Sequence, residues 1–197
     1  TLNLDNDGLN LQGYNFITDT YVDSSNPTTA YGGQGTLKIS NGPSQNSLTH
    51  MSVNLHLLGL PSNATVISSN LNLERESSTP TAPVVSVHEF TGDAWDENEA
   101  TWNYGKIGNS WTDGGLSTIG TSEDSGIDSA QVSNLFSLNV QDSVQNALTQ
   151  QSNDALRYVM TGFLPADQAP STLESVTFAS VDYDTSTGPL SQPSLEL

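Results

Sequence analysis

The sequence predicts an all-β protein, a jelly-roll β-sandwich of two antiparallel sheets with one short helix. Three observations predict this class. Short segments in which apolar and polar residues alternate recur along the 197 residues, and a period of two is typical of strands with one buried face. Turn-forming Gly, Pro, Asn and Ser separate these segments at regular spacing, as in sandwiches and barrels. The length of the chain fits one domain of this kind.

Residues 1–16 are predicted to form an additional strand that precedes the domain, and residues 17–197 are predicted to form the domain itself. Apolar residues alternate with polar ones in the first segment, although Asp5-Asn6-Asp7-Gly8 interrupts the pattern as a turn. In the first half of the domain, we predict strands over residues 17–22, 36–39, 51–57, 67–73 and 84–91.

Residues 93–105 are interpreted as a corner that holds the two halves of the domain together. They contain two Trp, one Tyr and four carboxylates in thirteen positions. Asp96 and Glu99 have the spacing of a capping box, which predicts a short helical turn. Trp95 and Trp102 are predicted to pack on the body of the domain, because large aromatic side chains anchor a connection firmly.

The second half of the chain contains a long connection, one helix and further strands. Residues 103–130 are rich in Gly, Ser and acidic residues, which predicts a long surface excursion. A helix is predicted over residues 142–150, with Asp142 as its cap and Val144 and Leu148 on one face. The strands predicted here cover residues 136–140, 156–160, 176–180 and 195–197.

The charge of the chain excludes some partners and suggests others. The formal net charge is −18, from 22 acidic and 4 basic residues. Nucleic acid and anionic membranes repel such a chain, so we expect neither as a partner. Carboxylate oxygens suit calcium ions, and solubility is the alternative explanation of the charge.

We expect an extracellular protein without a membrane-inserted segment. No apolar run reaches the length of a membrane span. The chain starts at Thr1 and shows no charged-then-apolar leader, which fits a secreted protein whose signal peptide has been removed.

We expect no enzymatic activity. The three histidines, His50, His56 and His88, lie in predicted strands. His56 and His88 fall on the polar faces of these strands, which predicts positions on the surface. The chain also has no nucleophile elbow, zinc-protease motif or phosphate loop.

Four acidic residues are the candidate ligands of a calcium ion. Asp19 and Asp23 lie in the first strand of the domain, and Asp182 and Asp184 lie near its last strand. The first and last strands of a sandwich often lie close together, and calcium accepts several oxygen ligands in irregular loops. The alternative is that these four carboxylates are solvated on separate surfaces.

Exposed aromatic residues are the candidates for sugar binding, because sugar rings stack on flat apolar surfaces. We select Trp111, Tyr104 and Tyr31 as candidates, while Trp95 and Trp102 are interpreted as core anchors. Asn63 begins an Asn-Ala-Thr triplet on a predicted turn and is a candidate glycosylation site.

Four groups of residues, in order along the chain, carry a resemblance to a known family. They are Asp19-Thr20-Tyr21-Val22-Asp23 with Tyr31-Gly32, Leu57-Leu58-Gly59-Leu60-Pro61, Trp95-Asp96-Glu97 with Ala100-Thr101-Trp102-Asn103, and Phe178-Ala179-Ser180 with Pro193 and Leu195. With these groups the chain resembles the DNRLRE family of extracellular jelly-roll domains over about residues 17–197. It departs from that family at residues 190–195, which lack the acidic and arginine residues of the closing motif.

The resemblance implies an accessory or structural extracellular module. Some members of the family resemble carbohydrate-binding modules of polysaccharide-degrading enzymes, and others occur in cell-surface proteins. Related jelly rolls imply a structural calcium ion by analogy of fold.

The segment before the domain suggests our main functional hypothesis, a structural subunit of an extracellular filament or surface polymer. In this hypothesis, residues 1–16 complete a sheet of a neighbouring copy by strand addition, which joins copies head to tail. The alternative position is an edge strand on the segment's own domain, since alternation does not say whose sheet is completed. The alternative function is a carbohydrate-binding module that recognises a polysaccharide. The predicted inter-subunit residues are Leu2, Leu4, Leu9, Leu11, Tyr14 and Phe16.

Overall fold

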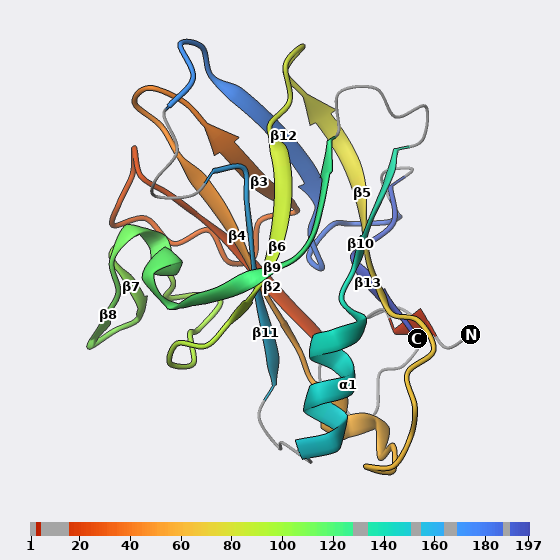
Figure 1. The fold of residues 1–197 in the computed structure, drawn as a ribbon. Helices are drawn as coiled ribbons and strands as arrows, with labels where there is room; N and C mark the ends of the chain where they lie inside the picture. The colour runs from red at the N-terminus through yellow and green to blue at the C-terminus, as the bar shows by residue number, and fades with distance from the viewer. Residues whose placement is uncertain (1–2, 5–15, 128–133, 151–154, 164–168, 187–189) are drawn as a thin grey trace.

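Antiparallel strands make up nearly all of the regular structure in the computed structural model, which describes residues 3–4, 16–127, 134–150, 155–163, 169–186 and 190–197 (Figure 1). This architecture confirms the predicted β-sandwich with one short helix. The strands are β1 (Asn3–Leu4), β2 (Ile17–Asp23), β3 (Thr36–Asn41), β4 (Ser47–Val53), β5 (Asn70–Ser78), β6 (Val84–Phe90), β7 (Tyr104–Lys106), β8 (Asn109–Ser110), β9 (Ile119–Ile127), β10 (Leu135–Asn139), β11 (Leu156–Thr161), β12 (Glu174–Ala179) and β13 (Ser194–Glu196).

Hydrogen bonds link eleven of these strands continuously, and the hairpin of β7 and β8 stands apart as a small second sheet. One part of the large sheet runs in the order β2-β4-β11-β6-β9. The other part runs β3-β12-β5-β10, with β13 and then β1 beside the first half of β5. A single pair, Ser40 opposite Ser47, joins β3 to β4 at the turn between the two parts.

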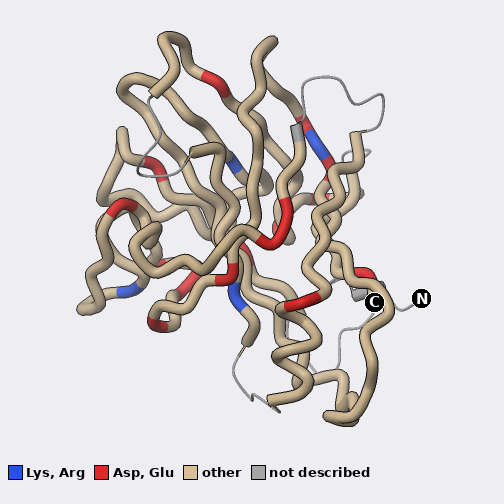
Figure 2. Tube along the Cα trace, viewed as in Figure 1, with Lys and Arg blue, Asp and Glu red and all other residues tan. Residues whose placement is uncertain are grey.

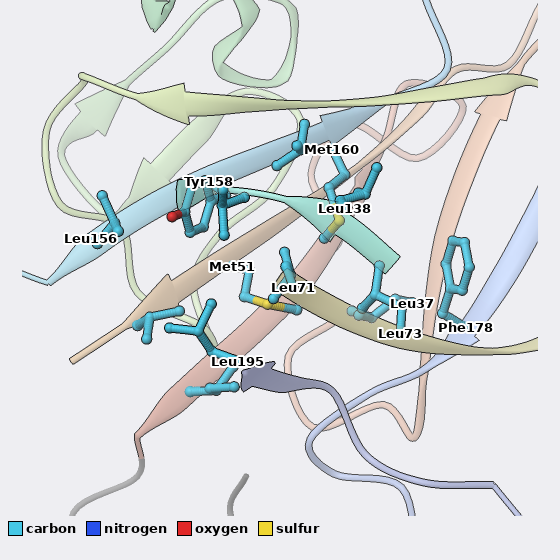
Figure 3. Close-up of a cluster of buried hydrophobic side chains, with 14 of the residues drawn as sticks. Leu37, Met51, Leu71, Leu73, Leu138, Leu156, Tyr158, Met160, Phe178 and Leu195 are labelled. Atoms are coloured by element: carbon cyan, nitrogen blue, oxygen red, sulfur yellow. The ribbon is translucent and has the colours of Figure 1, made fainter. Parts of the chain in front are cut away.

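The main core lies between these two layers (Figure 3). Alternate residues of the strands point into it, as the period of two predicts. Met51 of β4, Leu71 and Leu73 of β5 and Met160 of β11 are all fully buried. Tyr158 is also buried there, and its hydroxyl lies 2.7 Å from the hydroxyl of Ser143, so the polar end of this side chain has a partner.

A second apolar cluster lies on the outer face of the β2-β4-β11-β6 layer, under residues 93–118. Val22, Leu48 and Val159 project outward from this layer and are fully buried. Trp95 and Trp102 pack against the cluster, which confirms their interpretation as anchors. Strands such as β4 are therefore covered on both faces.

The corner itself differs from the predicted capping box. The Asp96 side chain does accept a hydrogen bond from the Asn98 amide at 2.9 Å. The Glu99 carboxylate instead accepts from the Ile107 amide at 2.9 Å, so it ties the corner to the β7–β8 hairpin. The chain forms turns over this stretch rather than a helix.

The predicted helix is confirmed, although Asp142 lies in its first turn and not at the cap position. Several other local predictions are wrong. Helix α1 covers Gln141–Gln150, and both Val144 and Leu148 are buried. Residues 103–130 are not a plain surface excursion, because they include β7, β8 and the whole edge strand β9. The strand expected over residues 51–57 stops at Val53 and gives way to a 3-10 helix at Leu55–Leu58. Ile67 lies outside any strand and is 89% exposed.

The described parts of the amino-terminal segment lie on their own domain. Asn3 and Leu4 pair with Glu196 and Leu195 of β13 in the same chain. Phe16, predicted as an inter-subunit residue, is instead buried in the core of its own domain, and its carbonyl accepts a bond from the Asn54 amide. The other predicted inter-subunit residues, Leu2, Leu9, Leu11 and Tyr14, lie outside the described residues.

Among the helices in the described ranges, none is long and apolar enough to cross a membrane.

Candidate functional site

A depression of about 240 Å³ opens beside the β7–β8 hairpin. Its lining combines two aromatic rings with several side chains that carry hydrogen-bonding atoms. The lining residues are Phe90, Gly92, Asp93, Asn109, Ser110, Trp111, Thr112, Ser117 and Thr118. Aromatic surface with a few convergent polar groups is the usual chemistry of small-molecule sites.

Trp111 is held rigidly at this depression. Its indole Nε1 donates a hydrogen bond to the Thr101 carbonyl at 2.9 Å. One face of the indole stacks on the ring of His50, with 4.6 Å between centroids and 13° between planes. Phe90 meets the same indole edge-on at 5.8 Å. The indole remains half-buried and lines the depression.

Two glycines make room for this indole. A Cβ on Gly105 would lie 3.0 Å from the Trp111 ring, and one on Gly115 would lie 3.2 Å from it. Gly115 also has a φ of +93°, and its neighbour Gly114 has a φ of +65°. Side chains other than hydrogen are disfavoured at such angles. The Gly114-Gly115 pair after Trp111 is therefore a sequence signal of this close packing.

His50 packs under the Trp111 ring as a neutral imidazole. The side chain is fully buried, and burial lowers its pKa to about 4. The hydrogen bond with the Gly114 carbonyl acts in the opposite direction and raises the pKa. Its Nε2 lies 2.7 Å from that carbonyl oxygen, and because a carbonyl only accepts, Nε2 carries the proton. Within the described part of the chain, neither His50 Nδ1 nor the buried Trp95 Nε1 has a hydrogen-bond partner.

The other two predicted sugar-binding aromatics do not line this depression. Tyr31 stacks on Tyr21, with 4.2 Å between ring centroids and 17° between planes, so each tyrosine covers one face of the other. Tyr104 lies half-buried in β7 and is absent from the lining. Of the three candidates, the structure places Trp111 at the depression.

A second candidate site is a cluster of three carboxylates from distant parts of the chain. Asp19 comes from β2, Glu97 from the corner and Asp182 from the loop after β12. One oxygen from each lies within 4.8 Å of the others. The structure therefore brings Asp19 and Asp182 together as predicted, although Asp182 follows β12 and not the last strand, β13. Glu97 was missed, because nothing in its spacing points to a residue 78 positions away.

Burial dominates the electrostatics of Asp19. Its side chain is buried, and desolvation raises its pKa to about 7 although Ser180 and Val181 donate hydrogen bonds to it at 2.7 and 3.0 Å. The negative charges of Glu97 and Asp182 add to this increase.

Glu97 is also perturbed, and it has a structural role. Burial raises its pKa, the hydrogen bond from the Asp19 amide opposes that change, and Asp182 and Asp96 raise the pKa further. The Asp19 amide donates to Glu97 at 3.1 Å from the side of β2 that faces away from β4. The corner is thereby fastened to the free edge of the sheet.

The donor set of this cluster fits a calcium ion. It offers three carboxylates from irregular segments, and calcium binds hard oxygen ligands in flexible geometry. None of the three forms an ion pair with a Lys or Arg among the residues that the structure describes. Asp19, Glu97 and Asp182 are the residues that would hold the ion, and the ion would supply the positive charge that these carboxylates lack.

The remaining predicted metal ligands lie elsewhere, so the predicted set of four does not form one site. Asp23 binds Lys38 at 3.3 Å and accepts from Gln45 at 2.7 Å. Although burial alone would raise the pKa of Asp23, hydrogen bonds from Ser25 and Gln45 and the Lys38 charge hold it below its usual value. Asp184 accepts a bond from the Ser186 amide.

Two other predicted positions can be compared with the structure. Asn63 is exposed on a turn, where a glycan could be attached. The prediction that His88 lies on the surface is wrong. Its side chain is buried, and its Nδ1 lies 3.0 Å from the carbonyl oxygen of Gly120 in the neighbouring strand β9.

The comparison with protein families decides the class of this domain. The model of carbohydrate-binding module family 96 matches residues 10–157. The chain belongs to carbohydrate-binding module family 96. The matched range includes Trp111, Asp19 and Glu97 and ends before Asp182. No curated protein matches the chain.

Membership of family 96 supports the part of the predicted resemblance that concerns carbohydrate-binding modules, and it does not confirm the DNRLRE type. A carbohydrate-binding module is a binding domain rather than a catalytic one, which is consistent with the expected lack of enzymatic activity. Such modules are typically extracellular or attached to surfaces, as the sequence also suggested.

Proposed function

We propose that this family 96 module binds a polysaccharide through the depression beside Trp111. The observation that carries the proposal is the half-buried indole at a depression that is also lined by hydrogen-bonding side chains. A sugar ring has an apolar face that can stack on Trp111 and hydroxyls that can bond to Asp93, Asn109 and the neighbouring hydroxyl side chains. The ordered indole offers this surface at little cost in conformational entropy.

Filling the depression is expected to abolish binding without disturbing the core. Ser117 is exposed and lines the depression, so Ser117→Trp occupies the space where a sugar would lie. We expect its affinity for a retained polysaccharide to fall at least about tenfold, which corresponds to ~1.4 kcal/mol. The measurement is affinity electrophoresis in gels containing plant, fungal and algal polysaccharides, followed by calorimetry with the one that retards the wild type most.

Two further variants control for this result. Ser171→Trp places the same side chain at an exposed position outside the depression and should bind like the wild type. Tyr31→Ala tests the other predicted aromatic surface. Unchanged binding in Ser117→Trp, or loss of binding only in Tyr31→Ala, would contradict the proposed site.

The proposal includes a structural calcium ion at Asp19, Glu97 and Asp182. The support for it is the oxygen donor set and the three separate segments that the cluster joins. In this position the ion would strengthen the attachment of the Trp-bearing corner to β2, since Glu97 already contacts the Asp19 amide.

The filament hypothesis has weaker support than carbohydrate binding. The family match concerns a binding module, and Asn3 and Leu4 pair with β13 of their own chain. Carbohydrate binding at a cell surface or in the extracellular space is therefore the function that we propose.

A further inference from the structure

We infer that Asn63 carries an N-linked oligosaccharide whose first sugar units lie in an apolar groove beside it. This site is separate from the depression at Trp111, and it does not depend on the proposed function.

The sequence around Asn63 provides the acceptor. Asn63-Ala64-Thr65 is the only Asn-x-Ser/Thr triplet without proline in the 197 residues. Such a triplet accepts an N-linked sugar when it lies on the surface of a secreted protein. Asn63 is exposed, and the Ala64 amide closes its turn by donating to the Pro61 carbonyl at 2.9 Å. The triplet therefore lies where a transferase can reach it.

A groove of about 410 Å³ opens next to this turn. Ala64 and Thr65 of the triplet line it, so the acceptor residue lies directly beside it. The volume is within the range of about 300–1,000 Å³ that is usual for small-molecule sites. None of the described residues of the lining has a charged side chain, and most are aliphatic. The large aliphatic ones are Leu60, Val66, Ile67, Leu148 and Leu197.

The groove leaves apolar surface in contact with solvent. Ile67 is 89% exposed and Leu60 is 37% exposed. A single exposed aliphatic residue is ordinary, but two that border one uncharged groove form a patch. Figure 2 shows that the loop of residues 54–69, at the lower right, has no Asp, Glu, Lys or Arg, although the net charge of the chain is −18. An uncharged ligand with an apolar face fits this surface.

Hydrogen bonds to α1 hold the loop in place, so the shape of the groove does not depend on a bound sugar. Gln145 accepts a bond from the Val66 amide at 2.8 Å and donates to the Ala64 carbonyl at 3.1 Å. Gln141 donates to the Val66 carbonyl at 2.9 Å. Because the surface is preformed, a ligand that binds it causes little further loss of conformational entropy in the protein.

A sugar attached at Asn63 is the occupant that these observations favour. The apolar face of a sugar ring and the methyl of an N-acetyl group can pack on Ile67 and Leu60, while the hydroxyls stay in water. The covalent link keeps the sugar at a high effective concentration beside the groove, so weak contacts suffice. A second copy of the chain would bring another charge of −18 to the same place, which disfavours self-association there.

The attachment requires a donor from the host, an oligosaccharide carried on a lipid pyrophosphate. Asn63 Nδ2 forms a bond to the anomeric carbon of the first sugar and loses one proton. The bond between that carbon and the pyrophosphate oxygen breaks, and the lipid pyrophosphate leaves with the electron pair.

Intact mass spectrometry of the protein secreted from yeast or insect cells tests the attachment. We expect the wild type to carry an oligosaccharide that begins with an N-acetylhexosamine, and Asn63→Gln to carry none. Thr65→Ser keeps the triplet and should be modified, whereas Thr65→Ala should not be. An unmodified wild type, or a modification that persists in Asn63→Gln, would overturn the assignment of this site.

Thermal unfolding and NMR spectroscopy of the glycosylated protein test the position in the groove. Compared with Asn63→Gln, the oligosaccharide should raise the unfolding temperature by about 2 °C, and nuclear Overhauser contacts should connect its first sugar with the Ile67 methyl groups. Ile67→Ser leaves the triplet intact and should lose this gain. Ile107→Ser is the matched control, since Ile107 is 79% exposed between β7 and β8, and it should keep the gain.

The two parts of the inference can fail separately. An equal gain in Ile67→Ser and the wild type, without contacts between the sugar and Ile67, would overturn the position in the groove while the glycosylation of Asn63 stands.

Discussion

Asp19→Asn is expected to stabilise the module at pH 8 in calcium-free buffer and to remove most of its pH dependence. The pKa of Asp19 is raised from 3.8 to about 7 by burial. A raised carboxyl pKa means that the folded state holds its proton more tightly than the unfolded state does. The resulting stability is fully present below pH 3.8 and is lost as the pH rises through about 7.

The size of this effect follows from the change in pKa. A change of about three units corresponds to ~4 kcal/mol, at 1.36 kcal/mol per unit. An asparagine at position 19 can keep both hydrogen bonds, because the Ser180 hydroxyl can accept as well as donate and the Val181 amide still finds an oxygen. The variant therefore loses the buried charge and keeps a hydrogen bond to each of these two partners.

Denaturant unfolding at pH 5 and pH 8 measures this prediction. The matched control is Asp113→Asn, which removes one charge from an exposed position where asparagine suits the positive φ of 50°. The control should follow the pH dependence of the wild type. A wild-type stability that stays constant between the two pH values, or an asparagine variant less stable at pH 8, would refute the prediction.

Calcium provides a second measurement on the same variant. In the wild type at pH 8, calcium should raise the unfolding temperature, because the ion offsets the charges of Asp19, Glu97 and Asp182 and binds the folded state. Magnesium should have less effect, since it demands a stricter geometry and dehydrates reluctantly. Asp19→Asn should lose most of the response. An equal response to calcium in the variant would place the ion elsewhere.

Gly32→Ala is expected to destabilise the protein by about 3 kcal/mol, at the upper end of typical overpacking. A Cβ at this position would lie 2.0 Å from the Glu97 carbonyl oxygen and 2.5 Å from its carbon. Both atoms belong to the backbone of the corner, so no side-chain rotation can relieve the clash. The corner must move away from the loop that contains Gly32.

The same displacement should weaken the attachment of Glu97 to Asp19 and reduce the response to calcium. Gly35→Ala is the matched control three residues further on. Its Cβ would meet the Tyr183 Cα at an ordinary 3.6 Å, and neither glycine has a positive φ. We expect the control to change stability by less than about 0.5 kcal/mol. Equal unfolding free energies for the two variants would show that the Gly32 contact does not matter.

Local patterns in the sequence were sufficient for much of the fold. Apolar residues alternate around Met51 and Leu71, and Val144 and Leu148 have helical spacing. Both patterns show which face of a strand or helix meets the core, and they can be recognised from nearby residues alone. The proximity of Asp19 and Asp182 was also predicted, although Asp182 follows β12 and not the last strand, β13. The alternation of residues 1–16 could not decide between an edge strand and a strand added to another copy.

Tertiary structure decided the features that depend on distant neighbours. His50 is buried because residues 93–118 cover the second face of its strand, and the buried His88 ring contacts the Gly120 carbonyl of β9. A period of two reveals neither contact. Edge strand β9 lacks apolar alternation because much of it is exposed.

For the candidate site, too, the sequence determined some features and the tertiary structure decided others. The sequence determined that the chain has aromatic residues able to stack on sugars and oxygen ligands suited to calcium. Tertiary structure decided which indole lines a depression and that Glu97 joins Asp19 and Asp182. Glu97 lies 78 positions after Asp19, and the chain forms several strands before it returns to the edge of β2. Contacts at such separations arise from packing of the whole domain, because no local pattern specifies them.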